Sequence, residues 1–358
     1  MKNKTKKSPI DWAKILSPVF IILIAILITS ILILAIGCHP LEAYHYMLLG
    51  AFGSFGALIN TISKMVPIAF AGLAVAISSR AGIFNIGLEG QLLFGGFGAA
   101  LAGLYITGLP ALIHIPVCLA AGMIAGMLYA LLPTILYVKK GVGLLVVHIM
   151  MNSIAKLLIT YLVSVPFAGD NKMIAATNPV QDSARLPYLL TSPNKLTIGI
   201  LIVITTACIM WFYLNKTTSG YELRTCGDNM EAARFAGIKT KWYQAGVLLA
   251  SGALAGLAGS VEVLGTYDRF YDGFSPGFGF DGIPIAMLAN GNPFGVLVGA
   301  FLFGALRIGS LNMQIKAGVS TEIVSVIQGI LITLISAQYI LRFASNKLVN
   351  KQKGEVTQ

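Results

Sequence analysis

The stretch Ser79–Gly96, SRAGIFNIGLEGQLLFGG, decides how the whole chain is interpreted. Its charged and amide residues, in a sequence otherwise suited to lipid, are Arg80, Asn85, Glu89 and Gln91. Such groups are costly in hydrocarbon unless they face a partner or a water-filled cavity. The glycines between them allow helix backbones to pack closely or to leave the helical path. The stretch therefore predicts a part of a membrane protein that lines a route through the bilayer.

The composition indicates a membrane protein. Of the 358 residues, 56% are hydrophobic and only 11% are charged, and the mean hydropathy is +0.80. Soluble domains carry about 25% charged residues. We therefore expect an all-α, polytopic protein embedded in the lipid bilayer, with room for about ten spans of ~20 residues each.

The net charge of +11 does not by itself indicate a nucleic-acid partner. The basic residues are spread over short loops and tails, as the positive-inside rule expects of a membrane protein, so no nucleic acid is predicted. The four cysteines are isolated, which indicates neither a disulfide framework nor a metal site. The basic start is followed by an apolar run without a clear cleavage site, which we interpret as a retained first helix.

Ten apolar runs predict about ten transmembrane helices, with eight to ten as the expected range. They lie near 17–37, 57–78, 86–107, 111–137, 144–164, 196–214, 243–264, 279–290, 293–308 and 321–341. The eighth and ninth runs are short and are separated by Asn290-Gly291-Asn292-Pro293, a strong break. A single re-entrant element is the alternative there. The whole chain, 1–358, is predicted to form one transmembrane domain.

The distribution of charge predicts the orientation of the spans. With the N-terminus inside, seventeen of the 25 Lys and Arg residues fall on the inner side and six on the outer side, while Lys64 and Lys156 lie within spans. This bias places both termini in the cytoplasm. The expected segments outside the spans are a basic N-terminal tail at 1–16, an extracytoplasmic loop at 166–195, a cytoplasmic loop at 215–242 and a cytoplasmic tail at 343–358.

The cytoplasmic loop contains the sequence GYELRTCGDNMEAARFAGI at 220–238. Asp228 or Asn229 can cap a helix start, because their side chains accept hydrogen bonds from unpaired N–H groups. Glu231 would then lie in the first turn, and Gly237 can end the helix. A short helix of mixed charge suits a protein socket better than a lipid surface, with a plain interfacial helix as the alternative.

Three segments resemble one family. GDNMEAARFAGI at 227–238 looks like the Gly-x-Asn-x-x-Ala-Ala-x-x-x-Gly-Ile signature of permease subunits of bacterial ABC importers. The branch concerned holds the ribose and simple-sugar, nucleoside and branched-chain amino acid permeases. RAGIFNIGLEGQLLFG at 80–95 is similar to the first box of its sugar and nucleoside members. GFGFDGIPIAMLANGNPFGVLVGAFLFGAL at 277–306 resembles their late box, and the two boxes together look most like nucleoside-type permeases.

The resemblance implies an ABC importer permease fold and a division of labour between subunits. The chain would form half of the translocation path of an ATP-driven importer for a nucleoside or a simple sugar. Without a Walker A sequence it would be no enzyme and bind no cofactor, and a cytoplasmic ATPase subunit would use the ATP and Mg. A second permease, in a heterodimer rather than a homodimer, and an extracytoplasmic substrate-binding lipoprotein would complete it. The chain would lie in the bacterial cytoplasmic membrane.

By the same resemblance, the short helix would dock in a cleft of the ATPase subunit as a coupling helix. Its predicted contact residues are Gly227, Asn229, Glu231, Ala232, Ala233, Arg234 and Gly237. The loop at 166–195 and the segment 267–272 would receive the binding protein. For the segment 267–272, the alternative is a solvated loop with aromatic anchors at the membrane interface.

The candidates for the translocation path are Asn85, Glu89, Gln91, Asn152 and Asn290. Structural alternatives remain open: Glu89 pairs with Arg80 or Lys64 in a packed bundle, and Asn152 bonds between helices. No catalytic and no metal-binding residue is predicted.

Two further polar residues lie in the span 144–164. His148 is interpreted as a packed or bonded polar group. Lys156, about twelve residues into the span, needs a carboxylate, carbonyls or a path to the interface, and Glu262 is a conceivable partner.

Two other functions are weighed against the importer permease. An ion-coupled secondary transporter of a small polar solute would use Glu89 and Lys156 as coupling groups. Inverted repeats with broken helices would favour it, but only one broken segment, 279–308, is evident. A membrane enzyme would need a metal-spaced histidine cluster, a nucleophile elbow or paired carboxylates in a pocket, and the sequence offers none of them.

Overall fold

A computed structural model describes residues 24, 26–171, 173–320, 323, 326, 329 and 330. The chain divides into two compact units, Leu48–Gly309 and a smaller one of Met1–Met47 with Ser310–Gln358. The predicted tails lie outside the described residues, as do the first part of the first predicted span and nearly all of the last.

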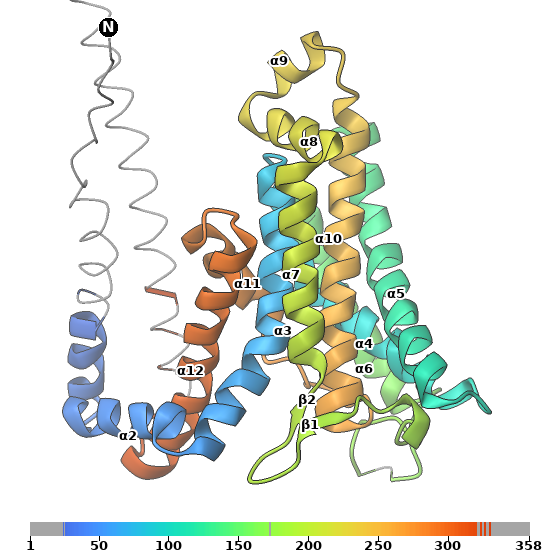
Figure 1. Ribbon diagram of the computed structural model, residues 1–358. Coiled ribbons are helices and arrows are strands. Elements are labelled where there is room, and N and C mark those ends of the chain that lie inside the picture. The colour runs from blue at the N-terminus through green and yellow to red at the C-terminus, as the bar shows by residue number, and fades with distance from the viewer. Residues whose placement is uncertain are drawn as a thin grey trace, which may run out of the picture. The chain divides into compact units, whose positions relative to one another are not determined.

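The described chain is mostly helical (Figure 1). Its α-helices are α2 (Pro40–Phe52), α3 (Phe55–Arg80), α4 (Leu88–Tyr105), α5 (Ala111–Lys140), α6 (Leu144–Ser164), α7 (Gly199–Lys216), α8 (Thr218–Asp228), α9 (Met230–Phe235), α10 (Thr240–Glu262), α11 (Phe278–Leu288) and α12 (Pro293–Ala317). Two short turns, η1 (Asp182–Ala184) and the π-helical η2 (Val263–Tyr267), and an antiparallel pair, β1 (Tyr188–Leu190) and β2 (Leu196–Thr197), complete the elements.

Six of the described helices are long and apolar enough to cross a membrane: α3, α5, α6, α7, α10 continued through η2, and α12. The count rises to seven if the helical segment Ile26–Ala35 and α2, which meet at 116°, form one broken span. The predicted count of eight to ten is therefore not confirmed in this part of the chain. With its 11 residues, α11 is only ~16 Å long. The glycine-rich α4 begins late, at Leu88, and carries Glu89 and Gln91 in its first turn.

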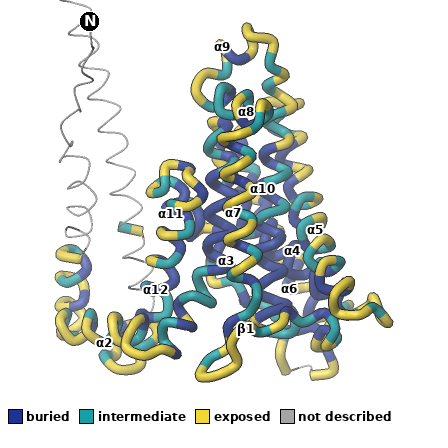
Figure 2. The backbone as a smooth tube through the Cα atoms, viewed as in Figure 1, coloured by how far each residue is buried: buried dark blue, intermediate teal, exposed yellow. Residues whose placement is uncertain are grey.

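In the larger unit, α3 and α10 form the centre. In both, 78% of the apolar stretch is buried, against 22% in α5 and 28% in α6 and α7. Figure 2 shows the same gradient, with the buried backbone running along α3, α4 and α10. Helices that expose so many apolar side chains face lipid or another apolar surface.

Small residues let α10 approach its neighbours closely. Gly252, Gly256 and Ser260 recur every fourth position and so share one face of α10. A methyl group added at Gly126 of α5 would lie 2.8 Å from the Cα of Gly256, and one added at Gly95 of α4 would collide with the Gly256 backbone. The three helices therefore meet backbone to backbone, as small-residue interfaces allow.

The connection at 166–195 is more ordered than the expected irregular loop. It contains η1, β1 and the start of the turn to β2, and its backbone bonds to the segment after α10. Thr177 N–H donates to the Phe270 carbonyl and Val180 N–H to the Asp268 carbonyl, both at 2.8 Å. The sequence did not predict this pairing, because the partner segment lies about ninety positions later in the chain.

The break after the eighth predicted span is a tight turn. Asn290 and Gly291 take φ values of 49° and 65°, in the left-handed region. They reverse the chain between α11 and α12, so the eighth predicted span is a short helix. The ninth is longer than predicted, since α12 extends to Ala317.

The smaller unit has its own apolar core of Ile33, Ala43, Met313, Val319 and Ile323. The Asn312 amide donates to the Tyr46 carbonyl at 2.8 Å and joins its two parts.

Candidate functional site

The predicted short helix exists. In the larger unit, α8 and α9 lie at the end opposite β1 and β2 (Figure 1). The Asn229 side-chain oxygen caps α9 by accepting hydrogen bonds from the N–H groups of Glu231 and Ala232, both at 3.0 Å. Gly237 follows with a φ of +83°. The predicted cap, first turn and end are thus confirmed, with Asn229 rather than Asp228 as the cap, since Asp228 ends α8.

Most of α9 is exposed, as a docking element requires. Glu231, Ala232 and Arg234 are exposed, whereas Ala233 is buried against the rest of the fold. The most exposed large side chain here is Phe235, at 93%. Sequence reasoning missed it because it occupies an unspecified position of the family signature. A lone aromatic residue in an otherwise small and polar helix was the available signal.

Gly227 has a different role from the exposed residues. A Cβ at this position would collide with the Arg80 carbonyl, and it would lie 3.1 Å from the N atom of Gly82. At Gly227 the backbone at the end of α8 therefore packs closely against the end of α3. Gly227 is not part of the exposed surface of α9.

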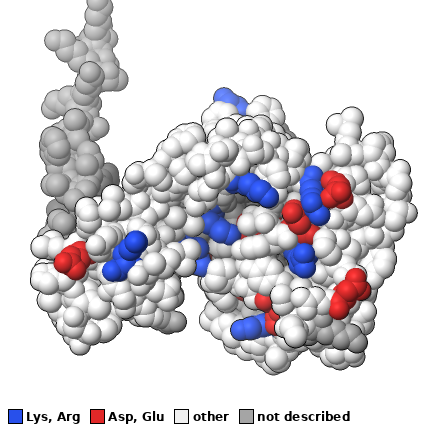
Figure 3. Space-filling view, turned by 90° about the horizontal axis from the view of Figure 1, so that it is seen from below, with Lys and Arg blue, Asp and Glu red and all other residues white. Residues whose placement is uncertain are grey.

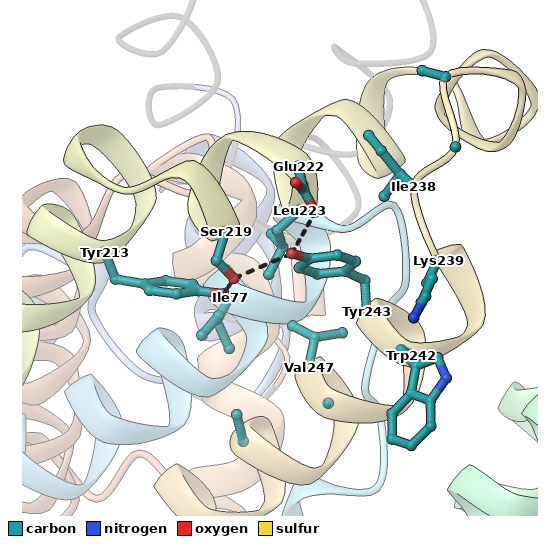
Figure 4. A pocket seen from close by; sticks show the side chains of 14 residues that line it. Ile77, Tyr213, Ser219, Glu222, Leu223, Ile238, Lys239, Trp242, Tyr243 and Val247 are labelled. Atoms are coloured by element: carbon teal, nitrogen blue, oxygen red, sulfur yellow. Dashed lines mark hydrogen bonds between the residues drawn. The ribbon is translucent and has the colours of Figure 1, made fainter.

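A cavity of about 640 Å³ opens beside α9, between α8 and the start of α10 (Figure 4). The Tyr243 hydroxyl donates to the Glu222 carboxylate at 2.7 Å and lies 3.3 Å from the Ser219 hydroxyl. The Tyr213 hydroxyl approaches Ser219 at 3.0 Å, and Trp242 is 77% exposed at the start of α10. This network ties α8 to α7 and α10, so a displacement of α8 reaches the central helix.

The second region is the break between α3 and α4, the predicted route. Asn85 is fully buried there. Its amide nitrogen donates to Gln91 Oε1 at 2.8 Å and to Ser251 Oγ at 2.9 Å, and its oxygen accepts from the Gly87 N–H at 3.0 Å. The Ser251 hydroxyl donates to the Ala74 carbonyl at 2.6 Å. The structure thus brings Asn85 and Gln91 together in a hydrogen-bond network that joins α3, α4 and α10.

Asn152 and His148 hold the same segment from α6. The Asn152 oxygen accepts from the Gly90 N–H at 3.0 Å, and its amide nitrogen donates to the Ile86 carbonyl at 2.9 Å. His148 Nδ1 accepts from the Ile86 N–H at 3.2 Å. Ile86 lies in the break and Gly90 in the first turn of α4, where backbone groups have no partner within the helix, so the structural alternative for each of the two α6 residues is confirmed.

Glu89 pairs with neither Arg80 nor Lys64. Its carboxylate accepts from the Gly279 N–H at 2.8 Å, in the first turn of α11. The Arg80 guanidinium instead donates to the Gly291 carbonyl at 3.2 Å. Asn290 is exposed in the neighbouring turn and does not join Asn85 and Gln91. The five route candidates are therefore divided between a packed joint and a separate exposed turn.

The opposite end of the larger unit carries further charges. Figure 3 views this end and shows basic and acidic side chains lying close together on a largely uncharged surface. Lys64 of α3 forms an ion pair with Glu262 at the end of α10. Glu262 is therefore not the partner of Lys156, which is exposed on α6 and has no ion pair within the described residues.

A metal site finds no support in the part of the chain that the structure describes. No three His, Cys, Asp or Glu side chains lie close enough together there to hold an ion.

Comparison with known proteins gives one consistent family. The family described as the branched-chain amino acid transport system permease component matches residues 57–336. The chain is 37% identical to a guanosine ABC transporter permease protein of Bacillus subtilis, over 95% of this chain and 97% of that protein. It is 31% identical to a glucose ABC transporter permease protein of Haloferax volcanii, over 93% of this chain and 90% of that protein. It is 30% identical to a nucleoside ABC transporter permease protein of Lactococcus lactis, over 99% of this chain and 100% of that protein.

Proposed function

The chain belongs to the permease family of the branched-chain amino acid transport type, and from this premise we propose that it is the membrane subunit of an ATP-driven importer for a nucleoside. One observation carries the proposal: similarity over nearly the whole chain to guanosine and nucleoside permeases. The similar identity to a glucose permease supports a simple sugar as the second candidate.

We assign α9 the role of the coupling helix. Its exposed Glu231, Arg234 and Phe235 would enter a cleft of a cytoplasmic ATPase subunit, which would use the ATP and Mg. The contact of Gly227 with the end of α3 would pass the movement to the bundle. In this division of labour the chain is not an enzyme and binds no cofactor.

The rest of the assembly follows from the same premise. A second, different permease would cover one apolar face, and an extracytoplasmic binding lipoprotein would dock at the β1–β2 end. About ten spans, with both termini in the cytoplasm of a bacterial cell, would place α9 on the inner side. The solute would pass the first turn of α4, where Asn85, Glu89, Gln91 and Asn152 lie, and the exposed Asn290 would line its inner exit.

The test is purification of the chain from native membranes in mild detergent, followed by ATP-dependent uptake of labelled guanosine, uridine, ribose and glucose by the reconstituted complex. Recovery of an ATPase and a second permease with nucleoside uptake is expected. Transport by the chain alone, driven by an ion gradient without ATP, would contradict the importer and support an ion-coupled secondary transporter.

A further inference from the structure

A cavity of about 420 Å³ lies between α3, the end of α10 with η2, and the β2 segment. Eight of its twelve lining residues are polar or charged: Asn60, Ser63, Lys64, Asn194, Lys195, Thr197, Glu262 and Thr266. A groove that holds lipid tails is apolar, because hydrocarbon satisfies no polar group. These side chains offer hydrogen-bond partners to a polar occupant, and the volume falls in the range of ~300–1,000 Å³ typical of small-molecule sites.

The ion pair of Lys64 and Glu262 lines this cavity. Glu262 is 1% exposed, and the Lys64 side chain keeps 21% of its surface accessible. The π-helical turn after Glu262 places two hydroxyls beside the pair: Thr266 donates to Glu262 at 3.1 Å, and Tyr267 accepts from Lys64 at 3.1 Å. Paired charges within an apolar bundle mark solute pathways. Because the two charges cancel, the pair suits a neutral solute.

Hydrogen-bonding capacity remains unused in this cavity. An ammonium has three N–H donors, and Lys64 directs two of them to Glu262 and Tyr267. Asn60 lies one turn before Lys64 on the same face of α3. It is exposed, and its side chain forms no hydrogen bond with any residue that the structure describes. The Ser63 hydroxyl, which donates to the Lys195 carbonyl at 3.1 Å, still has lone pairs to accept with.

Donors and acceptors alternating along one helix face match a pair of neighbouring hydroxyl groups, which both donate and accept. We propose that this cavity binds the hydroxyl-bearing part of the transported solute, such as the ribosyl group of a nucleoside, through Asn60, Ser63 and Lys64, with Glu262 holding Lys64 in place. The proposal rests on the proposed function, whose solute it defines further. The same chemistry recognises a free sugar.

The experiment uses the purified importer complex and the substitution Asn60→Leu, which removes the amide at similar size. The matched control is Asn215→Leu on α7, an exposed asparagine outside both cavities; among the residues that the structure describes, its amide bonds only to the Trp211 carbonyl of its own helix. Complex assembly with the ATPase is measured for both variants. For Asn60→Leu we expect the KM of uptake to rise about tenfold at unchanged kcat, as loss of one or two ligand hydrogen bonds predicts. The control keeps the wild-type KM.

A second measurement reports binding directly. In the detergent-solubilised complex, Asn60→Cys is labelled with a water-soluble maleimide, with Asn215→Cys as control. Guanosine and ribose each test the shared hydroxyl chemistry, and guanine tests the base alone. Protection of Asn60→Cys by guanosine supports the proposal, and additional protection by ribose assigns free sugars to the same site.

Two results overturn the proposal. One is unchanged KM with unprotected Asn60→Cys in a complex that transports, and the other is equal protection by guanine, which has no hydroxyl pair. A wild-type complex that takes up no nucleoside and no sugar overturns the proposed function itself.

Discussion

Gly227 at the end of α8 lies with its backbone directly against the backbone of Arg80 at the end of α3. The contact leaves no room for a side chain at position 227. It joins the segment that carries α9 to the turn that precedes the buried Asn85. We therefore expect a force applied to α9 to reach the α3–α4 break through this contact between main-chain atoms.

Replacement of Gly227 by alanine is expected to lower ATP-dependent uptake at least tenfold, because the added methyl group collides with the Arg80 carbonyl and separates the two segments. Uptake by reconstituted vesicles is the measurement. Gly246→Ala is the control, since a methyl group there has no heavy atom within 4 Å. Equal uptake by the two variants would show that this contact does not couple α9 to the bundle.

Phe235 is expected to be the apolar anchor of α9. Phe235→Ala should weaken retention of the ATPase subunit at least tenfold, as truncation of a buried aromatic residue at an interface does. Copurification of the ATPase at increasing detergent concentration measures it. Tyr221→Ala on α8, where the tyrosine is 63% exposed, should have no effect. Full ATPase retention by Phe235→Ala would exclude an anchoring role.

Asn85→Ala should destabilise the chain by about 1–3 kcal/mol, because it removes the Asn85 partner of the buried Gln91 side chain and of the Gly87 N–H. Thermal unfolding in detergent measures the change against Asn215→Ala, which alters an exposed amide. A wild-type midpoint for Asn85→Ala would mean that these groups find other partners.

The pair of Lys64 and Glu262 predicts strong coupling in a double-mutant cycle. Lys64→Met alone leaves a buried carboxylate unpaired and should cost about 3–5 kcal/mol, whereas Lys64→Met with Glu262→Met should restore most of the stability. The exposed pair of Arg185 and Asp182 is the control and should contribute less than about 1 kcal/mol. If the two substitutions changed the free energy of unfolding additively, a buried ion pair between positions 64 and 262 would be contradicted.

Cys226 on α8 is expected to react slowly. Burial raises the pKa of its thiol, and the nearby Glu222 carboxylate raises that pKa further. Because the thiolate is the reactive form, less of it is present at any pH near neutrality than for an exposed cysteine. Maleimide labelling followed by mass spectrometry from pH 7 to 9 should find a cysteine at Tyr221→Cys modified first. Faster labelling of Cys226 would show that α8 opens.

The sequence was sufficient for features that depend on neighbouring residues. The cap at Asn229, the end at Gly237 and the break after Leu288 follow from side chains and glycines within a few positions. Contacts between distant segments could not be predicted from the sequence. The partner of Glu89 is a backbone N–H in α11, and the partner of Lys64 lies 198 positions away. Nothing local fixes such pairs, because they depend on how the helices pack.

The predicted span count is not confirmed within the described residues for the same reason. Hydropathy reports the length of an apolar run, but a short helix buried by its neighbours needs no full membrane crossing. The helix α11 lies against α3 and carries Asp281 paired with Arg307 at 2.7 Å. Its apolar residues are thus explained by packing, which a window of sequence cannot separate from contact with lipid.

The glycine faces of α4, α5 and α10 have a mechanical consequence. Helices in backbone contact cannot slide or roll without collision, so we expect these three to travel as one stiff body. Changes of shape then concentrate where regular helical bonding is interrupted: at 81–87, in η2, and at 289–292. The first two of these joints lie beside polar networks, so a solute in contact with these networks would meet the chain where it bends.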